Sequence, residues 1–174
     1  FDTKLIGSLF ADNPLYEGLA PNLMVELAVE GKCDGWLIDT LTKDGRNLFD
    51  FMSEGVLWEM VFEGKEIGIS TALSGHLRID NLDELARINP DIVGVRGAVC
   101  AKGSRVNGVH REAVAEFKRQ LELRQTGEVE VRGGPEPVSV NGPSGQWVVI
   151  DGTGKTCAGI LAALTQQVQA DTDS

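Results

Sequence analysis

The feature of the sequence that most limits its fold is a pattern repeated four times between residues 4 and 122: a short apolar run followed by an amphipathic segment. Apolar runs of this length are typical of strands, and the segments between them are typical of helices. The predicted strands are KLIGSLFAD, GWLIDT, EIGISTALSG and DIVGVRGAV, and the predicted helices are PNLMVELAVEG, NLFDFM through VLWEMVFEGK, NLDELARI and VHREAVAEFKRQLEL. This alternation predicts an α/β fold of parallel βα repeats.

The predicted strands are apolar on consecutive residues, which indicates a sheet covered on both faces. Four βα units are too few to close an eight-stranded barrel. The pattern therefore leaves two architectures open, an open parallel sheet or half of a barrel.

The chain changes character after residue 123. Residues 124–145 are rich in Gly and Pro, with short alternating stretches that predict a linker and a hairpin. Residues 146–174 contain WVVID, a predicted strand, and TCAGILAALTQQVQ, a predicted helix. We therefore expect three parts: a (β/α)4 unit at 1–123, a linker and hairpin at 124–145, and a strand-helix extension at 146–174, so that a small ββα segment is appended to the repeats.

Composition narrows the class of function. The chain has 174 residues, 42% of them hydrophobic and 24% charged, which is typical of a soluble globular protein. No apolar run approaches the length of a membrane span, and FDTKLIGSLFAD does not have the pattern of a secretion signal. It also lacks an initiator methionine, as in a processed or trimmed chain or an excerpt of a longer one.

The net charge and the cysteines limit the class of function and the cellular compartment further. With a net charge of −10 and no basic stripe, the sequence does not predict nucleic-acid binding. Its three widely spaced cysteines argue against a disulfide framework or zinc cluster and indicate the reducing cytoplasm.

Polar and charged side chains follow each of the four predicted strands. In parallel α/β folds the carboxyl ends of the strands face the ligand. The residues at these ends are Asp12 after the first strand, Asp39 and Lys43 after the second, Ser74, Gly75 and His76 after the third, and Arg96 and Gly97 after the fourth. We expect them on one rim.

Asp39 and Lys43 are the candidate catalytic pair. An amine held beside a carboxylate can attack a sugar-phosphate carbonyl or transfer protons. The alternative is structural: Asp39 caps the following loop and Lys43 is a solvated partner.

Arg96 and Gly97 are candidate phosphate ligands, because a cation beside an accessible glycine amide suits an anion. Ser74 and Gly75 after the preceding strand would complete such a site. The alternative for Arg96 is an ion pair at the C-terminus of a helix. His76 is a candidate proton-transfer residue or an ordinary hydrogen-bonded loop histidine, and Asp12 is a further rim candidate.

Three of these segments also carry a family resemblance. LIDTLTKDGRNLFDF, ISTALSGHL and PDIVGVRGAVCAKGSRVNG resemble the (5-formylfuran-3-yl)methyl phosphate synthases, also called 4-(hydroxymethyl)-2-furancarboxaldehyde-phosphate synthases. These enzymes make the furan precursor of methanofuran-type cofactors in methanogens and methylotrophic bacteria. The resemblance runs from about Lys4 to Leu123 and does not cover the tail.

The resemblance implies a (β/α)8 barrel, of which this chain would supply strands five to eight. It implies a lyase that condenses two molecules of glyceraldehyde 3-phosphate, with loss of phosphate and water, through a lysine Schiff base. The family's D-T-x-x-K-D-G motif falls on Asp39 and Lys43, and Arg96 falls where phosphate is expected. No metal or other cofactor is expected, because the imine serves as the electron sink.

The chain departs from the family in one important respect. The family's Schiff-base lysine lies on the first strand in a D-V-K-N-P motif, and a second catalytic lysine follows the third or fourth strand; neither motif is present here. The alternatives are a first half supplied elsewhere and an inactive or repurposed half-barrel. Because half a barrel exposes two sheet edges, we expect a partner, either the missing N-terminal half or a second copy in a homo-oligomer. A non-catalytic barrel-completing subunit and a generic sugar-phosphate aldolase or isomerase remain alternative functions.

Overall fold

The computed structural model describes residues 3–100, 108–134, 138–141 and 147–150. The chain divides into two compact units, Phe1–Glu130 and Val131–Ser174.

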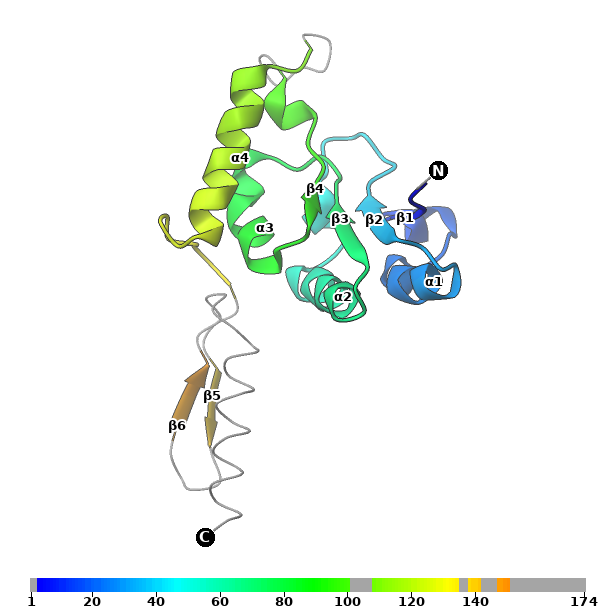
Figure 1. Cartoon of the computed structure of the whole chain (residues 1–174), viewed down its shortest axis with the longest axis horizontal. Helices are drawn as coiled ribbons and strands as arrows, with labels where there is room; N and C mark the ends of the chain where they lie inside the picture. Colours follow the sequence, from blue (N-terminus) through cyan, green and yellow to red (C-terminus); the bar gives the residue numbers. More distant parts are fainter. Residues whose placement is uncertain (1–2, 101–107, 135–137, 142–146, 151–174) are drawn as a thin grey trace. The chain divides into compact units, whose positions relative to one another are not determined.

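The first unit alternates strands and helices along the chain (Figure 1). Its strands are β1 (Ile6–Phe10), β2 (Gly35–Asp39), β3 (Ser70–Leu73) and β4 (Ile92–Val93). Its α-helices are α1 (Met24–Glu30), α2 (Glu54–Glu66), α3 (Leu82–Ile88) and α4 (Arg111–Gln125), and its short 3-10 helices are η1 (Asn13–Tyr16), η2 (Pro21–Leu23), η3 (Leu48–Asp50), η4 (Ile79–Asn81) and η5 (Gly97–Val99).

The four strands form one sheet in the order β1-β2-β3-β4, and every neighbouring pair is parallel. The register places Phe10 beside Asp39, Ile38 beside Leu73, and Leu73 beside Val93. The predicted α/β fold with a parallel sheet is therefore confirmed. Each strand also lies next to the strand that follows it in sequence.

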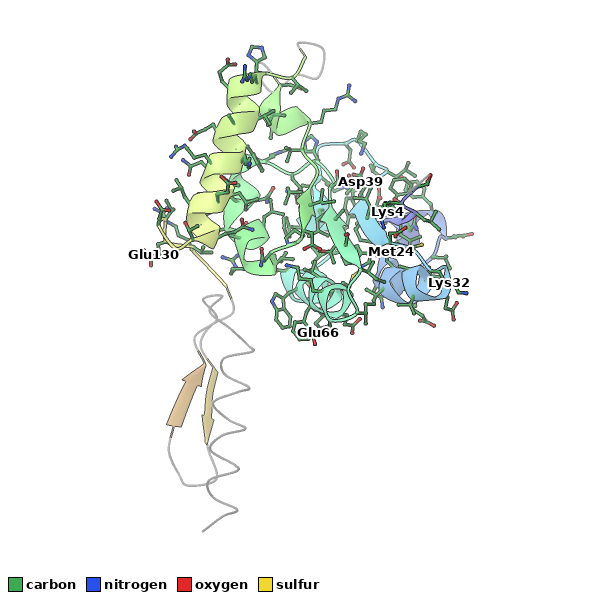
Figure 2. All side chains as sticks on the ribbon, viewed as in Figure 1. Lys4, Met24, Lys32, Asp39, Glu66 and Glu130 are labelled. Atoms are coloured by element: carbon green, nitrogen blue, oxygen red, sulfur yellow. The ribbon has the colours of Figure 1, made fainter. Side chains whose placement is uncertain are left out.

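One face of the sheet packs against the helices. Trp36 and Ile38 of β2 are fully buried in the hydrophobic core, together with Leu57 and Val61 of α2. Close approach depends on glycine: a Cβ at Gly7 of β1 would lie 2.7 Å from the Met24 Cε methyl of α1. Figure 2 labels Met24 on α1 and Asp39 at the carboxyl end of β2.

Alternate residues of the strands point to the opposite face of the sheet. On that face Ile6 of β1 is 47% exposed and Ile92 of β4 is 54% exposed. This differs from the expectation of a sheet covered on both faces, because the helices that the structure describes pack against the other face. Leu37 of β2, on the same face as Ile6, is partly buried.

The strand boundaries differ from the predicted ones in the third and fourth repeats. Glu66, predicted to begin the third strand, ends α2, and β3 begins only at Ser70. β4 is limited to two residues, and Gly97–Val99 turns into η5. β4 is the last strand in the sheet order, so within the described residues it has a hydrogen-bonding neighbour on one side only.

In the second unit, β5 (Val138–Asn141) and β6 (Trp147–Ile150) form an antiparallel pair. The strand predicted at WVVID is thus confirmed. The helix predicted over TCAGILAALTQQVQ lies outside the described residues. Among the helices that the structure describes, none has both the length and the apolar content needed to cross a membrane.

Candidate active site

A cavity of about 370 Å³ lies at the carboxyl ends of β2, β3 and β4. Six of the eight residues predicted from the strand ends line it: Asp39, Lys43, Ser74, His76, Arg96 and Gly97. Leu77, Gly94 and Val95 complete the lining. The parallel sheet therefore gathers a carboxylate, an amine, a hydroxyl, an imidazole and a guanidinium around one space.

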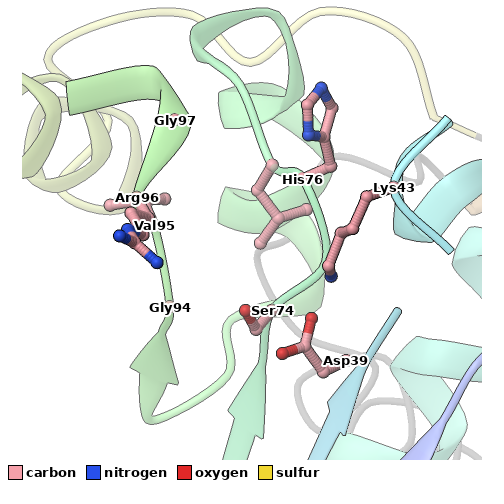
Figure 3. Close-up of a pocket in the computed structure, with 9 residues that line it drawn as sticks. Asp39, Lys43, Ser74, His76, Gly94, Val95, Arg96 and Gly97 are labelled. Atoms are coloured by element: carbon pink, nitrogen blue, oxygen red, sulfur yellow. The ribbon is translucent and has the colours of Figure 1, made fainter. Parts of the chain in front are cut away.

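Asp39 and Lys43 face each other across the turn that follows β2. Figure 3 shows the Lys43 amine and the Asp39 carboxylate pointing toward one another, with Ser74 beside Asp39. The Asp39 carboxylate accepts a hydrogen bond from the Thr40 backbone N–H at 2.7 Å, and the Lys43 amine donates to the Thr40 carbonyl oxygen. Both groups are thus fixed by local backbone contacts while remaining at the cavity wall.

Ser74 enters the cavity directly from the end of β3. Its N–H donates to the Ile38 carbonyl at 2.8 Å, so the ladder between β2 and β3 extends one residue beyond the strand. On the other side lies Gly94, where an added Cβ would be 3.0 Å from Ser74 Oγ. Glycine at position 94 therefore leaves room for the Ser74 hydroxyl.

Arg96 begins the turn of η5 on the side of the cavity opposite Lys43 (Figure 3). The Val99 N–H donates to the Arg96 carbonyl at 3.2 Å, and the Cys100 thiol also approaches that carbonyl at 3.1 Å. These contacts hold the Arg96 backbone and leave its side chain exposed. The guanidinium is consequently available to an anion in the cavity.

Gly75 and His76 form a turn of unusual backbone geometry after Ser74. Both have positive φ, +116° for Gly75 and +53° for His76, and the Gly75 carbonyl accepts the Leu48 N–H at 2.9 Å. An added Cβ at Gly75 would lie 2.8 Å from Thr40 Cγ2. Gly75 is therefore not part of the cavity lining, and it packs behind the turn that carries Lys43. The His76 ring is directed away from Asp39 in Figure 3.

Asp12 also lies off the cavity. It is 1% exposed, and its two carboxylate oxygens accept the backbone N–H groups of Leu41 at 2.8 Å and Thr42 at 2.7 Å. Burial on its own would raise the pKa of Asp12, but hydrogen bonds from Thr42 and Leu41 outweigh it and hold the pKa below its ordinary value. Asp12 is thus a hydrogen-bonded anion beneath the turn after β2.

Sequence reasoning did not single out Leu77, Gly94 and Val95 as part of this site. The signal for Gly94 was present: it precedes Arg96 by two residues in the predicted strand DIVGVRGAV, and residues two apart in a strand share a face. Nothing in the sequence pattern distinguishes Leu77 or Val95 from ordinary core residues.

A parallel βα protein with a carboxylate, an amine and a guanidinium at its strand ends has the layout of an α/β enzyme that acts on anionic substrates. Comparison with known proteins names the family: the 4-HFC-P synthase family model matches residues 1–118. The chain belongs to this family.

Curated relatives agree with the match. The (5-formylfuran-3-yl)methyl phosphate synthase of Methanopyrus kandleri is 40% identical over 111 residues, which are 64% of this chain and 47% of the relative. The protein of the same name from Methanocaldococcus jannaschii is 38% identical over 115 residues, 66% of this chain and 49% of the relative. That from Methanobrevibacter smithii is 38% identical over 118 residues, 67% of this chain and 50% of the relative. The chain thus spans about half the length of these curated relatives.

Proposed function

We propose that this chain supplies the second half, strands five to eight, of a (β/α)8 barrel that synthesises (5-formylfuran-3-yl)methyl phosphate. The observation that carries the proposal is the cavity that joins Asp39, Lys43 and Arg96 at the strand ends of a chain belonging to the 4-HFC-P synthase family. The reaction would be the condensation of two glyceraldehyde 3-phosphate molecules with loss of phosphate and water. Its product would serve methanofuran-type cofactor biosynthesis in the cytoplasm.

The sheet order supports the barrel. Strands in a (β/α)8 barrel follow one another in sequence around the barrel, and β1 to β4 do so here. The partly exposed face that carries Ile6 and Ile92 would then line the barrel interior. The first four βα units would complete that interior and pair with the outer edges of β1 and β4.

Asp39 and Lys43 would transfer protons at the substrate carbonyl. The Asp39 carboxylate would accept a proton from the carbon next to an imine, and the Lys43 ammonium would donate one to a departing oxygen. The imine itself would form on a lysine of the first half, because the family's D-V-K-N-P motif is absent from the sequence of this chain. His76 is a second proton-transfer candidate in the cavity lining.

Arg96, Gly97 and Ser74 would hold a substrate phosphate. The Arg96 guanidinium offers paired donors that match phosphate oxygens, and the Ser74 hydroxyl offers a third donor from the adjacent strand. Gly75 would contribute by shaping the turn after Ser74, since it packs against Thr40. With a net charge of −10 on the chain, local cations are required to attract an anionic substrate.

A second candidate is a non-catalytic subunit that completes a partner barrel. The observation that favours it is that the chain spans about half of each relative and lacks the D-V-K-N-P lysine motif. In that case Asp39 and Lys43 would be structural. A generic sugar-phosphate aldolase or isomerase would use the same rim but would form no furan.

The test is reconstitution. The chain is mixed with the segment of the Methanopyrus kandleri relative that precedes the matched region, and complex formation is measured by size-exclusion chromatography with light scattering. Glyceraldehyde 3-phosphate and borohydride are then added, and the trapped adduct is mapped by mass spectrometry. The proposal predicts a complex, an adduct on the added segment, and a near-ultraviolet furan absorbance in the untrapped reaction.

The other results separate the alternatives. If the complex forms but no furan appears, and Lys43→Arg changes neither complex formation nor the trapped adduct, the chain is a non-catalytic subunit. Turnover of glyceraldehyde 3-phosphate without furan indicates the generic aldolase or isomerase. An adduct on Lys43 in the chain alone contradicts the assignment of the imine to the first half.

A further inference from the structure

Asp12 is the one carboxylic acid side chain in the buried class among the described residues. It precedes η1 and occupies its N-cap position, where an aspartate commonly accepts a hydrogen bond from the first turn of the helix. Asp12 makes no such side-chain cap. Its carboxylate turns instead to residues that lie about thirty positions further along the chain, beyond β2.

The contacts of Asp12 converge on the segment Thr40–Lys43, here called the lysine loop. One carboxylate oxygen accepts the Leu41 N–H and the other accepts the Thr42 N–H. Next to Asp12, the Ala11 N–H donates to the Asp39 carbonyl at 2.7 Å. The two residues that follow β1 therefore form hydrogen bonds with the backbone on both sides of Thr40.

Two further contacts restrict the lysine loop. The Tyr16 hydroxyl lies 2.7 Å from Thr42 Oγ1, and Thr40 is buried against Gly75. Within this frame the Lys43 amine donates to the Thr40 carbonyl. The position of the amine relative to Asp39 is thus set by backbone atoms that Asp12 holds.

We propose that Asp12 is a positioning residue that fixes the lysine loop, so that the Lys43 amine and the Asp39 carboxylate face the same cavity. The carboxylate is suited to this role because it accepts two backbone N–H groups at once and needs no proton. An asparagine of the same shape would offer one oxygen, and its amide N–H₂ would face a backbone donor. The catalytic part of this inference rests on the proposed function, whereas the structural part does not.

The chain contains a matched control for this contact. At the opposite end of the same two strands, Asp34 accepts the Leu5 N–H at 2.8 Å and the Lys4 amine at 3.0 Å. Asp34→Asn therefore loosens an equivalent carboxylate contact between β1 and β2, far along the strands from Lys43. If Asp12 only stabilised the fold, Asp12→Asn and Asp34→Asn would affect Lys43 in the same way.

The experiment is competitive acetylation of the full-length chain with limiting acetic anhydride, read by peptide mass spectrometry with Lys32 as the internal reference. In Asp12→Asn the acetylation rate of Lys43 should rise about threefold or more, as expected when a hydrogen bond of ordinary net strength is lost. The Lys4 rate should stay unchanged in that variant. In Asp34→Asn the pattern should be reversed, with Lys4 faster and Lys43 unchanged.

An unchanged Lys43 rate in Asp12→Asn overturns the proposal, and so does an equal rise at Lys43 in both variants. If Asp12→Asn does not fold, amide hydrogen exchange of the wild-type chain decides. The Leu41 and Thr42 amides should exchange about 100-fold more slowly than that of Gly45, whose surroundings are open. Equal exchange rates contradict the contact.

Once the assembled protein makes the furan, Asp12→Asn should lower kcat about tenfold and leave KM within a factor of two, because the proposed phosphate ligands follow β3 and β4. Asp34→Asn should leave both constants unchanged. If no furan forms under any condition, the proposed function fails, while the acetylation result still decides the role of Asp12.

Discussion

Gly64 of α2 lies directly against Trp36 of β2: a Cβ added at residue 64 would be 2.9 Å from Trp36 Nε1 and 2.6 Å from Thr71 Cγ2. This contact sets the distance between α2 and the two central strands, and it lies beneath the strands that carry Asp39 and Ser74. The position of β2 and β3 relative to α2, and with it the shape of the cavity, thus depends on the absence of a side chain at Gly64.

We predict that Gly64→Ala destabilises the protein. The added methyl group overpacks a buried contact at a cost of about 1–3 kcal/mol, which exceeds the gain of about 1 kcal/mol from helix propensity. Gly55→Ala in the same helix is the control, because no atom lies within 4 Å of the added Cβ, and it should be neutral or stabilising. Urea unfolding followed by circular dichroism measures both, and a Gly64→Ala chain as stable as Gly55→Ala would contradict this packing.

Gly75→Ala tests the turn behind the lysine loop. Gly75 combines a φ of +116° with a Cβ position 2.8 Å from Thr40 Cγ2, so alanine introduces both backbone strain and a collision. The expected cost is about 2–4 kcal/mol. Gly68→Ala, at a φ of +76° with no atom nearby, should cost only about 1–2 kcal/mol. Equal unfolding midpoints for the two variants would show that the contact with Thr40 is unimportant.

Arg87 of α3 and Glu54 at the start of α2 form a bidentate pair, with distances of 2.6 and 2.8 Å. Their side chains are only 9% and 28% exposed, so removal of one partner leaves a poorly solvated charge. Arg87→Met should therefore cost about 2–4 kcal/mol in urea unfolding. Arg119→Met removes a pair with Glu116 whose side chains are 56% and 49% exposed, and should leave the midpoint nearly unchanged. Similar shifts in both variants would argue against a special role for the partly buried pair.

The ionised Asp12 carboxylate should make the stability of the fold sensitive to acid. Its pKa in the folded chain lies below the ordinary value of an aspartate, so the ionised carboxylate stabilises the fold at and above that ordinary pKa. That stabilisation is lost as the pH falls through the lower folded pKa. The difference in unfolding free energy between wild type and Asp12→Asn should accordingly be constant from pH 7 to about pH 5 and shrink below about pH 4. A difference that grows on acidification would mean that the folded pKa is raised.

The rim residues were predictable because parallel strands end at one edge of a sheet. That rule was sufficient to bring Asp39, Ser74 and Arg96 together from three separate segments. It could not separate Asp12 from the others, because the backbone N–H donors that orient the Asp12 carboxylate reach it only through the pairing of β1 with β2. The same limit applies to Gly75, whose contact with Thr40 depends on how two loops pack.

The sequence predicted which segments form strands better than it predicted the residues at which those strands begin and end. Apolar runs located all four strands of the first unit, but nothing in DIVGVRGAV indicated that pairing stops after Val93. Val95, Ala98 and Val99 continue the apolar pattern around Arg96, although β3 pairs with β4 only as far as Val93. Likewise, Asn81 directly precedes α3, yet its side chain accepts the Arg78 N–H and does not cap the helix.

The most direct test of the proposed function is furan formation from glyceraldehyde 3-phosphate by the chain assembled with the first half of a relative, in wild-type, Lys43→Ala and Asp39→Asn forms. Lys32→Ala, an exposed lysine on the α1 side of the unit, serves as the matched control. We expect furan absorbance in the wild type and the control, and a loss of at least about 100-fold in both site variants. Full activity in Lys43→Ala and Asp39→Asn would contradict it.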